Sequence, residues 1–237
     1  MRIRWYGQAA VLLTSDDGVR VFVDPFGEIP EEMQARRREQ MPNFRFDYAP
    51  IEDVEADVLL ITHEHFDHAG VETVGGRPHT VRSTAGTFDT PIGEVVGIAS
   101  EHDPVAGTQR GPNSIFVFSL DGLRVAHFGD FGQEELRPAQ REAIGAVDVL
   151  LLPVGGGPTV GGETAAQVVR ELRPRLVVAL HYGNEAVSFL GPPEPFLDAL
   201  GAPRVERLES SEAEAGPLLG EPGSPTVVLF AVPMKPA

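Results

Sequence analysis

Residues 58–70 read Val-Leu-Leu-Ile-Thr-His-Glu-His-Phe-Asp-His-Ala-Gly, an apolar run followed by a cluster of potential metal ligands. The run is apolar at odd and even positions alike, which is typical of a strand buried on both faces. His63 and His65 stand two positions apart on an extended segment, so their side chains point the same way. Asp67 and His68 follow where the chain turns. Burying four such groups without a metal or other partners would be costly, so the stretch predicts a metal site.

Other short apolar runs also lead to polar side chains. The runs at 21–23 and 176–180 are followed directly by Asp24 and His181, and Asp130 lies just beyond a third run. Asp24 is a candidate acceptor that orients a ligand histidine. An ordinary turn aspartate is the alternative for that residue.

Strand and helix patterns alternate along the chain. Residues 114–120, the dipeptide Asp121-Gly122 and a second apolar run predict a β-hairpin. Helical periodicity is clear over 163–172 and weaker over 134–144. This alternation predicts an α/β layered fold. Since no linker is apparent, we expect a single domain over residues 1–237.

Two segments depart from this pattern. Residues 28–50 are rich in proline and charge and longer than a connection requires, so we expect an insertion or lid. Within it, Arg36 and Arg37 are candidates to bind an anionic group of a substrate, the alternative being a solvated helix whose arginines pair with its own glutamates. Residues 210–225 are predicted to be a surface loop before a last strand at 227–232.

The amino-acid composition excludes several classes of partner and of chemistry. The 237 residues carry a net charge of −16, which argues against a nucleic-acid partner. The absence of cysteine excludes disulfides, thiol catalysis and thiolate metal sites. The sequence shows neither an export signal nor an apolar run long enough to span a membrane. We therefore expect a cytoplasmic protein that acts on a small molecule, with the oligomeric state left open between monomer and homo-oligomer.

The stretch Thr62–His68 resembles the H-x-H-x-D-H signature of the metallo-β-lactamase superfamily. That resemblance implies two divalent metal ions, zinc first and manganese second. It also implies three further ligand positions, which follow in order along the chain: His102, Asp130 and His181. The first ion would take His63, His65 and His102, the second would take Asp67, His68 and His181, and Asp130 would bridge them.

A longer resemblance is to the branch of bacterial proteins similar to ascorbate-6-phosphate lactonase. It rests on residues 113–118, 122–127, 148–156 and 164–174. It implies a four-layer αββα sandwich with the metals where the two sheets meet. Asn113 and Tyr182 are further candidates for substrate binding.

Three positions depart from the pattern of that branch. Gln8 stands where a histidine is usual, Gln133 follows Gly132 in place of a histidine, and Gly161 replaces an aspartate. None of the three is a ligand in the mapping, so they bear on the substrate and not on metal binding.

The implied reaction is hydrolysis of an ester, lactone, amide or phosphodiester by a hydroxide that two metal ions share. Asp67 would orient the nucleophile or accept its proton, and Asp130 and His181 complete the catalytic set. A phosphodiesterase or nuclease of the same superfamily is the nearest alternative. A metal-binding module without catalysis is the alternative from another class.

Remaining features have ordinary interpretations as strong as the functional ones. His127 is read as a hydrogen-bonded core histidine in preference to a proton donor. The glycines at 155–157 and 161–162 could cradle a phosphate or form a tight connection.

Overall fold

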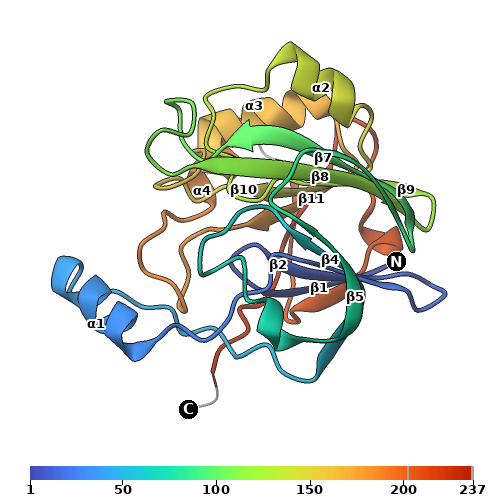
Figure 1. Ribbon diagram of the computed structural model, residues 1–237. Coiled ribbons are helices and arrows are strands. Elements are labelled where there is room, and N and C mark those ends of the chain that lie inside the picture. The colour runs from blue at the N-terminus through green and yellow to red at the C-terminus, as the bar shows by residue number, and fades with distance from the viewer. Residues whose placement is uncertain (202, 236–237) are drawn as a thin grey trace.

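The computed structural model describes residues 1–201 and 203–235, which form two β-sheets facing each other (Figure 1). The six-stranded sheet has the order β13 (Glu212–Glu214), β1 (Arg2–Gly7), β2 (Ala10–Thr14), β3 (Arg20–Val23), β4 (Val54–Ile61) and β5 (Val74–Arg82). The eight-stranded sheet has the order β12 (Arg204–Arg207), β14 (Thr226–Leu229), β11 (Leu176–Leu180), β10 (Val149–Pro153), β9 (Leu123–His127), β8 (Pro112–Leu120), β7 (Gly93–Glu101) and β6 (Gly86–Thr90). One apolar core joins residues of both sheets.

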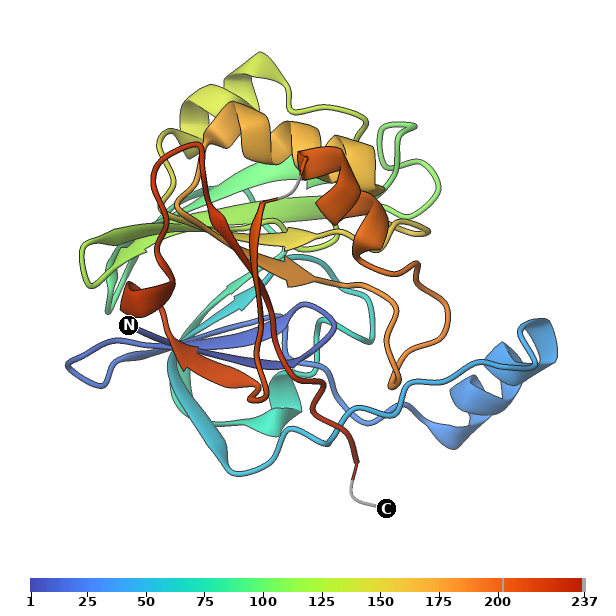
Figure 2. The same ribbon diagram turned by 180° about the vertical axis from the view of Figure 1, so that it is seen from behind.

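Helices cover the outer face of the eight-stranded sheet. Figures 1 and 2 show α2 (Pro138–Ile144), α3 (Gly162–Leu172) and α4 (Glu194–Leu200) on that face. α3 turns Ala165, Val168 and Leu172 inward, as its periodicity predicts. On the other side of the sandwich the helical layer is thin and includes the single turn η1 (Val71–Thr73). The expected α/β sandwich of metallo-β-lactamase type is confirmed.

Most predicted elements form where the sequence places them. The hairpin is confirmed, with Leu120 opposite Leu123 across the Asp121-Gly122 turn. α2 begins at Pro138, because proline fits the first helical turn, where its missing N–H has no partner to lose.

The surface loop predicted at 210–225 is wrong in part. β13 (Glu212–Glu214) pairs antiparallel with β1, and η2 (Gly216–Leu218) follows it. A three-residue edge strand has no local pattern strong enough to predict it. It forms because the exposed edge of β1 offers unpaired backbone groups.

The segment at 28–50 forms a helix, α1 (Glu31–Gln40), that stands away from the body of the molecule (Figure 1). All ten of its residues are exposed or half-buried. Beyond the helix the chain returns to the body, where Phe46 pairs with Val187 and the Asp47 N–H donates to the Ala186 carbonyl. One end of this excursion is therefore attached to the loop that follows β11.

Strand ends determine where polar side chains gather. β9, β10, β11 and β14 run parallel, so their carboxyl ends share one edge of the sheet.

Within the residues that the structure describes, no helix has the length and apolar character needed to cross a membrane.

Candidate metal centre

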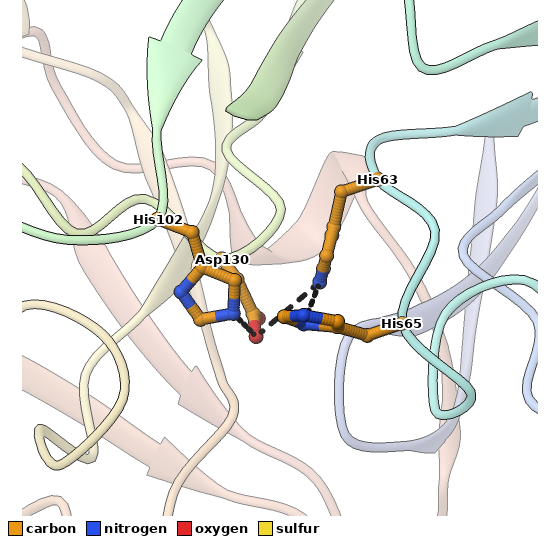
Figure 3. A group of neighbouring side chains, drawn as sticks. All are labelled: His63, His65, His102 and Asp130. Atoms are coloured by element: carbon orange, nitrogen blue, oxygen red, sulfur yellow. Dashed lines mark hydrogen bonds and ion pairs between the residues drawn. The ribbon is translucent and has the colours of Figure 1, made fainter. Parts of the chain in front are cut away.

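The polar cluster of the sequence gathers between the two sheets. His63, His65, Asp67 and His68 follow β4 of the six-stranded sheet. The other three positions follow strands of the eight-stranded sheet: His102 after β7, Asp130 after β9 and His181 after β11. Figure 3 shows His63 and His65 reaching from one side towards His102 and Asp130 on the other.

Two groups of these side chains match the two expected ligand sets. His63, His65, His102 and Asp130 offer ligand atoms within 4.8 Å of one another. A second group with the same spacing consists of Asp67, His68 and His181. The structure thus brings all seven sequence-derived positions together.

Asp130 lies at the centre of the cluster and is 2% exposed. Its carboxylate is 2.9 Å from His102 Nε2, 3.2 Å from His68 Nε2 and 3.4 Å from His181 Nε2. Burial alone would raise the pKa of Asp130, but His181 and His68 hold it well below its ordinary value. The carboxylate is therefore ionised and is shared among rings from both groups.

Three histidines are held by one ring nitrogen and turn the other to the cluster. His63 Nδ1 is 3.0 Å from the Thr62 hydroxyl, and His68 Nδ1 is 2.9 Å from Asp24 Oδ2. His102 Nδ1 is 3.0 Å from the Pro158 carbonyl. This arrangement fixes ring orientation and is typical of metal-binding histidines.

Asp24 belongs to the cluster through its hydrogen bonds. Its carboxylate accepts the backbone N–H of Thr62 at 2.7 Å and the Thr62 hydroxyl at 2.6 Å, besides contacting His68. The side chain is fully buried. These are the contacts expected of a carboxylate that orients a ligand histidine.

The electrostatics of the cluster favour a cation. Burial lowers the pKa of His63, and the charge of His68 lowers it further, so the His63 ring is neutral and keeps a lone pair. Burial also lowers the pKa of His68, but Asp130 and Asp67 outweigh it and raise that pKa well above the ordinary value. A positive charge is therefore stabilised at this point.

Two buried atoms support the same conclusion. Among the described residues, His68 Nε2 and Asp130 Oδ1 lie 3.2 Å apart, yet neither atom has a hydrogen bond of good geometry. Buried polar atoms are rarely left without a partner, so two of them facing one cluster need an explanation. Imidazole nitrogens and carboxylate oxygens are the donors that zinc and manganese accept, so the residues fit a metal centre.

A cavity of about 500 Å³ opens onto the cluster. His65, Asp67, His102, Asp130 and His181 form its floor. Its walls come from five segments and consist of Arg37, Met41, Phe44, Phe66, Gln109, Arg110, Gly157, Pro158 and Phe189. Phe44 and Phe189 stack with ring centroids 5.4 Å apart and an interplanar angle of 8°.

Sequence reasoning missed Gln109 and Arg110. Both belong to a loop in which the Asp103 carboxylate accepts four backbone N–H groups, including that of Arg110 at 2.7 Å. The Asp103-Pro104 turn after His102 was the one signal available.

Three of the four substrate-binding candidates lie outside the cavity lining. Asn113 donates to the Phe128 carbonyl and the Ser100 hydroxyl, and accepts the N–H of Asp130. Tyr182 is buried, stacks on Trp5 at 5.8 Å and borders a separate hollow. Arg36 lies on α1 and, of the two helix arginines proposed, only Arg37 borders the cavity.

His127 is a hydrogen-bonded core residue. It is fully buried, its Nε2 is 2.9 Å from the Ala9 carbonyl, and its Nδ1 accepts the N–H of Gly129. Gln133 is likewise bonded internally, to Gln140 and to the backbone of Glu101.

Of the glycine-rich stretch, only Gly157 borders the cavity. A Cβ on Gly155 would collide with the carbonyl oxygen of His181, and one on Gly162 with the backbone of α4. These two glycines therefore serve close packing.

Comparison with known proteins agrees with this geometry. The family profile described as "Beta-lactamase superfamily domain" matches residues 2–181. A UPF0173 protein of Pyrococcus abyssi is 30% identical over 208 residues, covering 78% of this chain and 84% of its own. A UPF0173 metal-dependent hydrolase of Thermococcus onnurineus is 28% identical over 225 residues, covering 85% and 92%.

The solved structures agree as well. One from Thermotoga maritima, named as a candidate zinc-dependent hydrolase of the metallo-β-lactamase superfamily, superposes with a TM-score of 0.71 at 28% identity and covers 97% of both chains. Fold, cluster and relatives together define a metal-dependent hydrolase. The chain belongs to the metallo-β-lactamase superfamily.

Proposed function

We propose that this chain is a dinuclear hydrolase that cleaves a small ester, lactone, amide or phosphodiester, with zinc or manganese held by the seven side chains of the cluster. The observation that carries the proposal is the position of Asp130 between the two histidine groups. A carboxylate with both oxygens directed at imidazoles from different groups suits a bridge between two ions. When bound, the ions would supply an acidified water and a charge that polarises the substrate oxygen.

The chain's own residues account for the remaining steps. Asp67 borders the cavity and accepts a hydrogen bond from Gln8 at 3.0 Å, so its carboxylate is held in place to orient the attacking water or accept its proton. His181 and Asp130 lie on the same floor, where they would hold the metals beneath the substrate. The stacked pair Phe44 and Phe189 lines the same cavity and gives it an apolar wall beside the floor.

We also propose a substrate type, a cellular location and a role for the segment at 28–50. Likeness to the ascorbate-6-phosphate lactonase branch suggests lactones as one substrate type. The net charge of −16 favours a small molecule over a nucleic acid, and we propose a cytoplasmic location. The segment at 28–50 would act as a lid, because Arg37, Met41 and Phe44 border the cavity.

Metal content and turnover test the proposal together. Elemental analysis should find about two divalent ions per parent chain. Asp130→Ala should lose at least one ion and most activity towards 4-nitrophenyl hexanoate, γ-butyrolactone or bis(4-nitrophenyl) phosphate. His79→Ala changes an exposed histidine of β5 and should match the parent. A metal-loaded chain that cleaves no ester, lactone, amide or phosphodiester would instead be a metal-binding module.

A further inference from the structure

We infer that the substrate carries an anionic group, bound by Arg110 and Arg37, beside an apolar acyl or aryl group that packs on Phe44 and Phe189. This inference rests on the proposed hydrolytic function and names its substrate class. It concerns the walls of the cavity, whereas the metal centre forms the floor.

The charge of the cavity walls is positive. Arg37 and Arg110 are the charged wall residues, and the carboxylates of the lining are Asp67 and Asp130 on the floor. Neither guanidinium lies within 4.0 Å of a carboxylate oxygen in the described part of the chain. Since the metals would neutralise the floor carboxylates, both arginines remain available to an anion in an otherwise acidic protein.

Arg110 is delivered by an ordered loop. Asp103 accepts the N–H groups of Val105, Gly107, Gln109 and Arg110 at 2.7–3.0 Å, and His102 N–H donates to the Gly111 carbonyl. The base of the Arg110 side chain is therefore fixed relative to the ligand His102. A guanidinium on a fixed base is suited to bidentate binding of a carboxylate or phosphate.

Arg37 belongs to a different segment, the helix α1. Its guanidinium lies over the ring of Phe66, 5.8 Å from the centroid. Phe66 stands between the ligand positions His65 and Asp67, so this contact keeps Arg37 above the floor. Two arginines from separate segments can thus reach one anionic group.

Hydrogen bonds within the chain hold the apolar wall of the cavity in place. The Ser188 hydroxyl donates to the Asn43 carbonyl at 2.7 Å and accepts the Arg45 N–H at 2.9 Å, which ties the segments carrying Phe44 and Phe189 together. Met41, which is 40% exposed, continues the wall. A polar sugar would leave this surface uncovered, whereas an acyl or aryl group would bury it.

Binding of matched probes tests the inference. Isothermal titration calorimetry on the metal-loaded protein would use 3-phenylpropionate, phenylphosphonate, acetate and the neutral 3-phenylpropanamide. We expect one phenyl-bearing anion to bind at least tenfold more tightly than the amide and than acetate. The comparison of carboxylate with phosphonate identifies the anionic group.

Variants of the wall residues distinguish anion binding by the arginines from anion binding by the metals. Arg110→Ala should raise the Kd of that anion at least tenfold and leave the amide within twofold, Arg37→Ala should act in the same direction, and Arg110→Lys should retain part of the affinity. Arg38→Ala, on the same helix but outside the lining, is the control. An anion held by the metals alone would keep its Kd in both alanine variants. That result, or an amide that binds as tightly as the anions, would overturn the inference.

Turnover keeps the two proposals distinguishable. We expect the parent to prefer 4-nitrophenyl hydrogen adipate over 4-nitrophenyl hexanoate in kcat/KM, and Arg110→Ala to remove the preference. If a chain with two ions cleaves neither these esters nor a lactone, amide or phosphodiester, the proposed function fails, while the binding data still decide which class of ligand the cavity walls bind. If both esters are cleaved equally and the anions gain no affinity, only this inference fails.

Discussion

The side-chain amide of Gln8 donates a 3.0 Å hydrogen bond to Oδ2 of Asp67. The Gln8 backbone carbonyl accepts the N–H of His181 at 3.1 Å and the indole N–H of Trp5 at 3.0 Å. One residue therefore contacts ligand positions that follow strands of both sheets. Its φ of 49° places it in the left-handed region, a conformation that persists only where surrounding contacts impose it.

Replacing Gln8 tests whether it orients Asp67. Gln8→Leu keeps most of the side-chain volume but removes the donor. We expect two metal ions still to bind and kcat/KM for 4-nitrophenyl hexanoate to fall about tenfold, or ~1.4 kcal/mol, because the Asp67 carboxylate is no longer held. Elemental analysis and steady-state kinetics check this. A rate within twofold of the parent would show that the hydrogen bond is dispensable.

Removing Asp24 should weaken metal binding without removing a ligand. Asp24→Ala leaves His68 Nδ1 and the Thr62 hydroxyl without their acceptor, so the His68 ring loses its orientation. We expect metal affinity to fall roughly 10–100-fold in competition with a chromogenic chelator. Asp148→Ala is the control, since Asp148 accepts the Arg124 N–H at the opposite end of the strands. Equal affinities in the two variants would make Asp24 an ordinary turn residue.

Asn113 should act on stability and not on substrate binding. Asn113→Ala leaves the Asp130 N–H and the Phe128 carbonyl unpaired in a buried place, each at a cost of about 1–3 kcal/mol. We expect a lower free energy of unfolding in urea and an unchanged KM for 4-nitrophenyl hexanoate. The opposite outcome, a raised KM at parental stability, would return Asn113 to a substrate-binding role.

The loop at 103–111, which carries Arg110, should lose its hydrogen bonds to the Asp103 carboxylate in acid. Burial raises the pKa of Asp103, but four backbone N–H donors outweigh it and hold the pKa below its ordinary value. Since the folded pKa is depressed, the stabilisation is complete above the unfolded pKa of about 3.9 and is lost as pH falls through the folded pKa. Hydrogen exchange of the four amides, corrected for intrinsic rates, should lose protection over that range.

Two comparisons make that measurement specific. Asp103→Asn should lower the protection of at least two of the four amides at every pH, because each carboxylate oxygen accepts two N–H groups and an amide keeps one acceptor oxygen. The Ser114 amide, which donates to the Thr62 carbonyl, should stay protected while the fold persists. Amides of the loop and of Ser114 that open together would indicate global unfolding and contradict the prediction.

The sequence predicted the floor of the site better than its walls. The ligand positions follow apolar strand runs, and carboxyl ends of neighbouring strands meet at one edge, so their convergence follows from local pattern and the family resemblance. Arg110 was missed because its position depends on a side chain, Asp103, that accepts backbone N–H groups in an aperiodic loop. The stacking of Phe44 on Phe189 depends on contact between distant segments, which no local pattern encodes.

The separation of the ligand positions between the two sheets has a consequence for the lifetime of the fold. On the proposed assignment, each ion joins residues after β4 to a residue after β7 or β11, so each acts as a cross-link between the halves of the sandwich. Binding free energy at such a cross-link adds to the free energy of folding. A chelator would then lower the free energy of unfolding, and metal starvation would shorten the lifetime of the folded protein as well as abolish its activity.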